Sequence, residues 1–258
     1  MPDFSSLGDV PLFVLLAVPL VILFAYTIYG ATGFGSSVIG VPILAHWFPL
    51  AFVVPLITII DLAATTQVNF RQWRTADLTE FRRLVPTGFV GIAIGVTLLV
   101  HLPRGPALLA LAVFIAAYGL YLLAGRVRST HASRHWAWPA GFFGGVFSAL
   151  FGTGGPIYVS YLSARLDGKA ALRSTASLMV GFSVVLRAAA FAVSGILLET
   201  KLLVTGVALL PVMVVGLWLG NHLHDRLSRG GLLKVIALLL CGNGVLLAFR
   251  AFEAMAVR

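Results

Sequence analysis

Two glycine-rich stretches, Tyr29-Gly-Ala-Thr-Gly-Phe-Gly-Ser-Ser37 and Ser148-Ala-Leu-Phe-Gly-Thr-Gly-Gly-Pro156, set the architecture of this chain. Each stretch follows a long apolar run and precedes a short one of roughly 10–13 residues, which is too short to span a membrane comfortably. Glycine lets the backbone leave a helix, and proline at the start of the next helix sacrifices no hydrogen bond. The stretches therefore predict a broken or re-entrant half-helix in each half of the chain.

Composition places these breaks in a membrane protein. Of the 258 residues, 59% are hydrophobic and 10% are charged, and the mean hydropathy is +0.99. A soluble domain carries about 25% charged residues, so this chain cannot cover a water-facing surface of its size. A spanning helix needs about 20 apolar residues, which leaves room for roughly eight to ten segments. We predict an all-α, polytopic transmembrane helical bundle embedded in the lipid bilayer.

Several function classes are excluded by what the sequence lacks. The net charge of +9 is explained by basic loops on the cytoplasmic side of a membrane, so we expect no nucleic-acid partner. The single cysteine, Cys241, excludes an intrachain disulfide and a cysteine-based metal cluster. The histidines are scattered, and no Ser/His/Asp or Glu-rich constellation suits hydrolysis. We therefore expect no enzyme activity, no catalytic residue, no metal and no cofactor.

The two halves of the chain resemble each other. Gly33-x-Gly35 matches Gly152-x-Gly154 at an offset of 119 residues. Pro86-x4-Gly91-x3-Gly95 matches Pro211-x4-Gly216-x3-Gly220 at an offset of 125, which Gly119 and Gly244 also keep. Because three matches occur in order, we predict an internal duplication. Residues 1–125 form the first transmembrane repeat, 126–136 a cytoplasmic basic linker, and 137–258 the second transmembrane repeat.

The distribution of Lys and Arg predicts the orientation. The basic clusters lie at residues 71–83, 126–134, 165–173 and 226–229, and we assign them to the cytoplasm. The acidic N-terminus then lies outside, in a multi-pass protein of the inner membrane. Ten crossings satisfy this pattern and make the two five-segment repeats inverted, as in many secondary transporters. Eight crossings with two re-entrant segments remain an alternative.

The breaks are candidate anion-binding elements. Backbone freed at membrane depth must be buried in protein or line a wet cavity, and the restarting helix points its positive dipole end there. Two such breaks related by a repeat axis would form one site near the midplane. The candidate substrate-binding residues in the breaks are Gly33, Gly35, Ser36, Ser37, Gly152, Thr153, Gly154 and Gly155. Close helix packing through small residues is the alternative.

Two ionisable residues lie inside apolar runs, where charge is costly and commonly functional. Asp61 and Arg187 are 126 residues apart, so they occupy nearly equivalent places in the two halves. Arg187 is a candidate guanidinium clamp for an oxyanion, and Asp61 a candidate proton-coupling group or counter-ion. The alternative is an ion pair that only holds the bundle together.

Three further polar residues are weaker candidates for the substrate path. Gln67 and Asn69 follow Asp61 towards the end of its predicted helix, and Arg173 begins the equivalent helix of the second half. Gln67 and Asn69 could line the path, or they could mark a helix end that enters water. Arg173 could be a second anion contact or an ordinary interfacial charge.

The Gly-x-Gly breaks, the Pro-x4-Gly-x3-Gly segments and Leu172-Arg-Ser-Thr-Ala-Ser177 together resemble the TauE/SafE sulfite-exporter family over essentially the whole chain. The resemblance implies a bacterial inner-membrane protein that moves sulfite, organosulfonates or related small anions without a cofactor. It also implies that Gly33, Gly35, Gly152 and Gly154 lie at the substrate site.

The leading hypothesis is a secondary transporter, either an exporter or an importer, that binds a small anion such as sulfite or an organosulfonate between the two breaks. Asp61 is its candidate proton-coupling group. An uncoupled anion channel, a membrane-embedded enzyme, and a non-catalytic membrane subunit that anchors a partner are the alternatives. Whether the chain forms a homo-oligomer stays open.

Overall fold

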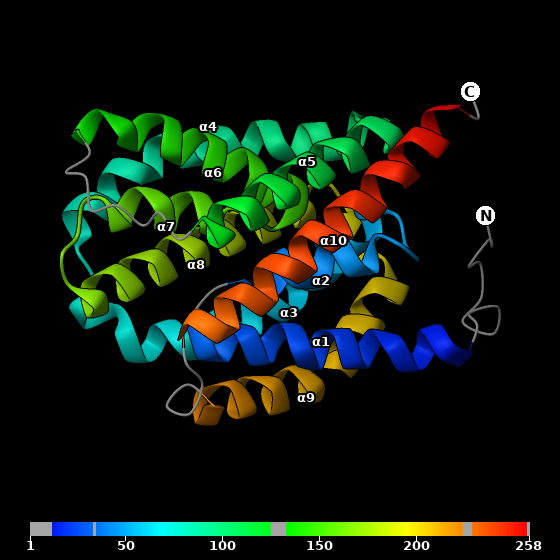
Figure 1. Ribbon diagram of the computed structural model, residues 1–258, viewed down its shortest axis with the longest axis horizontal. Helices are drawn as coiled ribbons and strands as arrows, with labels where there is room; N and C mark the ends of the chain where they lie inside the picture. The colour runs from blue at the N-terminus through cyan, green and yellow to red at the C-terminus, as the bar shows by residue number, and fades with distance from the viewer. Residues whose placement is uncertain (1–11, 33–34, 125–132, 224–228, 257–258) are drawn as a thin grey trace.

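Figure 1 shows the protein as a computed structural model, which describes residues 12–32, 35–124, 133–223 and 229–256. These ranges contain ten α-helices, three short 3-10 turns and no strand, which confirms the all-α prediction. The helices are α1 (Leu12–Thr32), α2 (Ser36–Leu44), α3 (Leu50–Gln72), α4 (Leu78–His101), α5 (Arg104–Leu123), α6 (Ala137–Phe151), α7 (Gly155–Ser163), α8 (Lys169–Val193), α9 (Thr200–Leu223) and α10 (Arg229–Ala256).

Six of the described helices, α3, α4, α5, α8, α9 and α10, are long and apolar enough to cross a membrane. By contrast, α2 and α7 have nine residues each. A nine-residue helix is roughly 14 Å long, less than half of a hydrocarbon core of about 30 Å. Neither α2 nor α7 is therefore long enough, as a helix, to reach from one side of the hydrocarbon core to the other, which favours the count of eight crossings.

The two short helices fold back along the helices that precede them. A Cβ atom at Gly40 of α2 would lie 3.7 Å from that of Ala25 in α1, although the two residues stand on opposite sides of the break. In the second half, the ring of Tyr158 in α7 packs against Gly144 of α6. Each break is therefore the tip of a helical hairpin. We call these the α1–α2 hairpin and the α6–α7 hairpin.

Helix pairs in the two halves of the chain match. Helix α1 packs on α9 while α6 packs on α4, α5 packs on α10, and α3 packs on α8, so exchanging the two halves leaves the same pairs (Figure 1). Glycines mediate these contacts: a Cβ atom at Gly95 would overlap the backbone at Val146, and one at Gly220 would overlap the backbone at Thr27. The Pro-x4-Gly-x3-Gly segments are thus helix-contact motifs.

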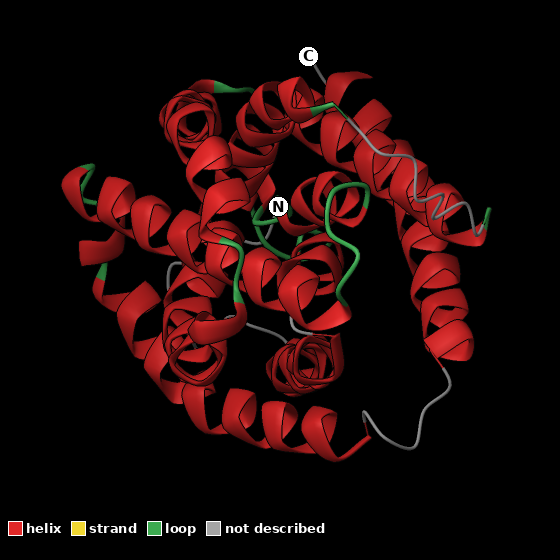
Figure 2. Ribbon diagram, turned by 90° about the vertical axis from the view of Figure 1, so that its left-hand side faces the viewer, coloured by secondary structure: helices red, strands yellow, loops and turns green. Residues whose placement is uncertain are grey.

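Apolar side chains occupy both the interior and the outside of the bundle. The buried core includes Ile22, Val53, Ile57, Leu111 and Leu247. Large apolar residues are also exposed on α4, α5, α8, α9 and α10, at Phe89, Val113, Val185, Trp218 and Phe249. Soluble proteins rarely expose so much apolar surface, whereas a lipid-facing surface requires it. Figure 2, turned by 90° from Figure 1, shows that helices make up nearly all of the described chain.

Candidate anion site between the two hairpins

The centre of the site is the carboxylate of Asp61, halfway along α3 and only 3% exposed. Its Oδ1 atom accepts hydrogen bonds from the Tyr26 hydroxyl at 2.7 Å and the Ser36 hydroxyl at 2.8 Å. Its Oδ2 atom accepts one from the Ser37 hydroxyl at 2.9 Å. Tyr26 belongs to α1, while Ser36 and Ser37 begin α2. The α1–α2 hairpin thus wraps its polar tip around a carboxylate of α3.

The second half contributes a guanidinium. Arg187 of α8 is 1% exposed, and its Nη2 atom lies 3.4 Å from Oδ2 of Asp61. Its Nη1 atom donates to the backbone carbonyl of Ser148 near the end of α6. A buried ion is expensive unless it is paired and hydrogen-bonded, and Arg187 has both kinds of partner. The ion pair joins α3 to α8, one helix from each half.

The tips of both hairpins meet at this ion pair. Helix α6 ends because the N–H groups of Gly152 and Thr153 turn back to the carbonyls of Ser148 and Phe147, at 2.8 and 3.2 Å. This cap puts Gly152 at φ 70°, where only glycine is at ease. A Cβ atom at Gly152 would lie 2.6 Å from Oγ of Ser37 and 3.2 Å from Nη1 of Arg187. The backbone of one break therefore contacts the side chains of the other.

Three buried donor groups around this cluster have no hydrogen-bond partner among the described residues: the Tyr29 hydroxyl, the Thr153 hydroxyl and Nε of Arg187. Leaving a buried donor unpaired costs about 1–3 kcal/mol, so native proteins seldom do so without a reason. The site therefore has a set of donors already used by Asp61 and a second set that could serve a bound anion.

Comparison with known proteins bears directly on this arrangement. A family model described as "Sulfite exporter TauE/SafE" matches residues 18–247. The chain belongs to the TauE/SafE sulfite exporter family. Its sequence is 26% identical over 196 residues to the "Probable inner membrane transporter protein TsaS" of Comamonas testosteroni, which covers 74% of this chain and 80% of that protein. No solved structure matches the chain significantly.

Membership of the TauE/SafE family settles the class of protein. The family consists of membrane transporters, not enzymes, so this chain is a multi-pass membrane transporter. In the described ranges, no three His, Cys, Asp or Glu side chains are placed to hold a metal ion. The functional residues of this TauE/SafE member are therefore those that could bind and release a solute.

The structure brings together most of the residues selected from the sequence. Ser36, Ser37, Asp61, Gly152 and Arg187 form one cluster. The neighbouring Thr153, Gly154 and Gly155 are buried at the tip of the α6–α7 hairpin. Gly35 lies at the tip of the other hairpin with φ 104°, and a Cβ atom there would have nothing within 4 Å. Gly33 lies outside the described residues.

The three weaker candidates lie away from the ion pair. Gln67 is exposed beyond Asp61 on α3, and Asn69 has no described side chain. Arg173 precedes Arg187 by 14 residues on α8, which corresponds to roughly 21 Å along a helix. Tyr29 lies within electrostatic range of both Asp61 and Arg173. The roles proposed for these three residues stay predictions.

Sequence reasoning missed Tyr26, Tyr29 and Ser148. The tyrosines looked like ordinary aromatic residues of an apolar run, and Ser148 acts through its backbone carbonyl, which any residue supplies. A usable signal was present, because Tyr26 and Tyr29 are three residues apart on the last turns before a break. That spacing puts both hydroxyls on one face of α1, towards the break.

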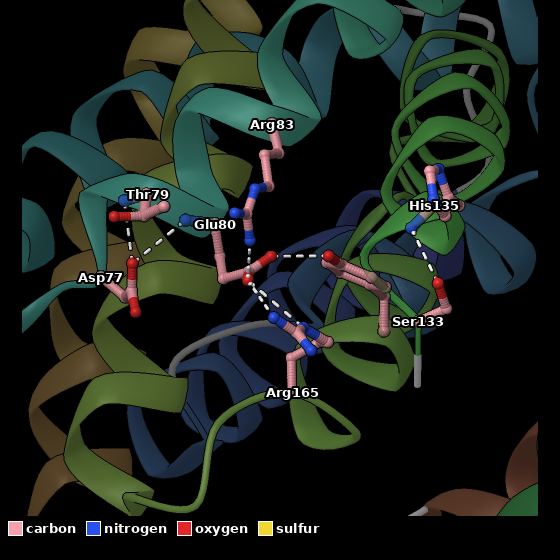
Figure 3. A network of polar contacts seen from close by, with 8 residues as sticks. Asp77, Thr79, Glu80, Arg83, Ser133, His135 and Arg165 are labelled. Carbon is pink, nitrogen blue, oxygen red and sulfur yellow. Dashed lines mark hydrogen bonds and ion pairs between the residues drawn. The ribbon is translucent and has the colours of Figure 1, made fainter. Parts of the chain in front are cut away.

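A second polar cluster ties the two halves at the basic end of the bundle (Figure 3). Glu80 of α4 is 3% exposed and accepts hydrogen bonds from Tyr161 at 2.6 Å, Arg165 at 2.9 Å and Arg83 at 2.5 Å. Asp77 caps the same helix by accepting from the N–H groups of Thr79 and Glu80, at 2.8 and 3.1 Å. The hydrogen bonds from Arg165 to Glu80 raise the pKa of the Arg165 guanidinium. We call Glu80, Arg83, Tyr161 and Arg165 the Glu80 clasp.

Proposed function

We propose that this TauE/SafE member is a secondary transporter of a small oxyanion, with sulfite and organosulfonates as the leading substrates, bound between the tips of the two hairpins. One observation carries the proposal: hydroxyl and guanidinium donors from both halves converge on a single buried carboxylate. Donors that hold a carboxylate suit any oxyanion of similar size. The family model that matches the chain supports the sulfur oxyanions among the candidates.

Each half would contribute a different kind of donor. Arg187 supplies the positive charge as a planar fork that suits an oxyanion better than a lysine ammonium would. Ser36 and Ser37 supply hydroxyls at the N-terminal end of α2, where the helix dipole also favours negative charge. Broken helices whose N-terminal ends face the substrate are a recurrent feature of secondary transporters.

Alternating access would come from a rocking motion of two packed groups of helices. The α1–α2 hairpin packs with α9, and the α6–α7 hairpin packs with α4. Because the site lies where the two hairpin tips touch, relative motion of these groups would open it to one side at a time. Asp61, the carboxylate that faces Arg187 in this contact, is the proposed proton-coupling group.

Flux into proteoliposomes tests the transporter proposal. We expect saturable uptake of one anion class from a panel of sulfite, sulfoacetate, sulfate, lactate and chloride. Arg187→Lys keeps a buried positive charge but loses the guanidinium fork, so flux should fall at least about tenfold. The exposed Arg134→Ala is the matched control and should transport normally. Ionic currents that do not saturate with anion concentration would favour a channel. Absence of flux in folded, inserted protein would favour an anchoring subunit.

Proton coupling has its own test. Asp61→Asn preserves the size of the side chain but cannot ionise. We expect it to abolish flux driven by a pH gradient while anion exchange continues. An unchanged pH dependence in this variant would contradict the coupling role.

The proposed location is the inner membrane, with the basic loops in the cytoplasm and the N-terminus outside. The name of the Comamonas testosteroni relative supports the inner membrane. Single cysteines in a Cys241→Ala background test the orientation with a membrane-impermeant maleimide. Cysteine at Glu199 should react in intact cells, whereas cysteine at Asp167 should react only after permeabilisation. The reverse pattern would overturn the orientation.

A further inference from the structure

The donors expected to hold the substrate are already occupied by a side chain. Ser36, Ser37 and Arg187 direct hydrogen bonds to the two oxygens of Asp61, and Tyr26 completes the set. A carboxylate presents two anionic oxygens to these donors, as a sulfonate or a carboxylic acid anion would. In this structure, Asp61 thus takes the place that the proposed function assigns to the transported anion.

Charge balance limits how the transported anion can replace the Asp61 carboxylate in this site. With Asp61 ionised, the pair formed with Arg187 has no net charge, and adding an anion would leave one uncompensated negative charge in a buried site. Such a charge is expensive away from water. With Asp61 protonated, one singly charged anion beside Arg187 restores neutrality. The protonated carboxyl also gains a donor that can point at the anion.

We infer that Asp61 is an internal stand-in for the transported anion, so that the anion binds only together with a proton and the site selects singly charged anions over doubly charged ones. This inference rests on the proposed function and deepens it by specifying the charge class of the substrate. The favoured anions are sulfonates, hydrogen sulfite and monocarboxylates, and the disfavoured ones are sulfate and other dianions.

Few other groups near Asp61 could take up the proton instead. Tyr26 and Tyr29 face it from α1, and Arg187 faces it from α8. Helices α2 and α6, which also contribute to this contact, contain no titratable residue. The titratable residues of α4 and α9 lie at the helix ends. A proton taken up with the anion at neutral pH is therefore assigned to Asp61.

The unpartnered donors explain why an anion with three oxygens could displace the carboxylate. Thr153 follows Gly152, whose backbone contacts both Ser37 and Arg187. Its buried hydroxyl and Nε of Arg187 have no partner among the described residues. A sulfonate could use the donors released by Asp61 for two oxygens and the spare donors for the third. The carboxylate of Asp61 has no third oxygen to offer them.

Calorimetry on the purified full chain in nanodiscs tests the inference with methanesulfonate as the monoanion and sulfate as the dianion. Titrations in buffers with different ionisation enthalpies count the protons taken up. We expect one proton per methanesulfonate and an affinity that falls about tenfold per pH unit over the range where that proton is taken up. Sulfate should bind at least about tenfold more weakly than methanesulfonate. Asp61→Asn should bind methanesulfonate without proton uptake and with the same affinity at every pH.

The possible results separate a failure of the stand-in role of Asp61 from a failure of the proposed transport function. Methanesulfonate binding without proton uptake, or sulfate binding as tight as methanesulfonate, would overturn the stand-in role while leaving anion transport intact. Failure of both probes and of sulfite and lactate to bind would overturn the proposed function and this inference with it. If Asp61→Asn does not fold, the proton count and the monoanion preference of the wild type still decide the question.

Discussion

In the α1–α2 hairpin the short helix begins with Ser36 and Ser37, whereas the positions 119 residues later, Gly155 and Pro156, begin α7 without a hydroxyl. The long helices that follow differ in the complementary way, because α3 carries Asp61 at nearly the same position as α8 carries Arg187. Two copies of the first half would bring two carboxylates together, and these would repel each other. If the two halves arose by duplication, as the sequence predicts, the difference between Asp61 and Arg187 is what makes the centre an ion pair.

The same two hairpins also differ at their outer ends. Arg165 follows α7 and pairs with Glu80 of α4 at 2.9 Å. At the repeat offsets, the corresponding residues of the other half are His46 and Thr205, which cannot form an ion pair. His46 instead contacts Asn243 at 3.3 Å, and its carbonyl accepts from Arg250. Burial and the charge of Arg250 lower the pKa of the His46 imidazole. The end of the bundle that carries the Glu80–Arg165 ion pair is therefore held together by opposite charges, whereas the end that carries His46 is not.

The largest expected effect comes from removing one charge of the central pair. Arg187→Ala leaves Asp61 buried without its partner, which should destabilise the protein by about 3–5 kcal/mol. Asp61→Asn combined with Arg187→Gln removes both charges and should recover most of that loss without restoring transport. Thermal unfolding in detergent measures both variants. Equal destabilisation of the single and double variants would show that the charges do not act as a pair.

Alanine substitutions at the two hairpin tips should destabilise the protein by a smaller amount, and by different amounts at each tip. Gly35 and Gly152 both have positive φ, so alanine at either position costs about 1–2 kcal/mol in backbone energy. Only Gly152→Ala also meets a neighbour, Oγ of Ser37 at 2.6 Å, which should add about 1–3 kcal/mol. Gly195→Ala is the control, because Gly195 has φ 79° and open space. Unfolding temperatures of the three variants test the order, which would be contradicted if Gly35→Ala were the most damaging.

The Glu80 clasp should contribute less than the central pair. Glu80→Gln keeps the shape but weakens charge-assisted bonds to Tyr161, Arg165 and Arg83, so we expect a loss of about 2 kcal/mol. The same change at the exposed Glu253 should be nearly neutral. Proteolysis of the loop between α7 and α8 should accelerate in the first variant alone. Similar rates for both would mean that the clasp does not tie this end.

The smallest effect on stability should come from Thr153→Val. Its buried hydroxyl has no partner among the described residues, so an isosteric methyl should change stability by less than about 1 kcal/mol. Transport should nevertheless weaken, with a higher KM, if the hydroxyl serves the anion. Thr58→Val is the matched control, because the Thr58 hydroxyl donates to its own helix at Val54. A flux identical to the wild type would remove Thr153 from the site.

Much of this organisation was predictable from the residues. The Gly33-x-Gly35 and Gly152-x-Gly154 stretches predicted the two breaks, and the mid-segment positions of Asp61 and Arg187 marked them as unusual. The number of crossings stayed open between eight and ten, because a short apolar run that turns back looks the same in sequence as one that crosses. Tyr26 and Tyr29 were missed because a tyrosine in an apolar run reveals its hydroxyl partner only in three dimensions.

Composition and local pattern were enough to predict a helical membrane protein, two related halves, a helix break in each half and one buried charge in each half. These features depend on properties that act over a few residues, such as the length of an apolar run relative to the bilayer and the freedom of glycine. Tertiary structure alone decided that the breaks become hairpins and that Asp61 takes three hydroxyls and faces Arg187, 126 residues away. Such partners are chosen by packing between helices that are distant in the chain, because a buried charge is stable only where its neighbours satisfy it.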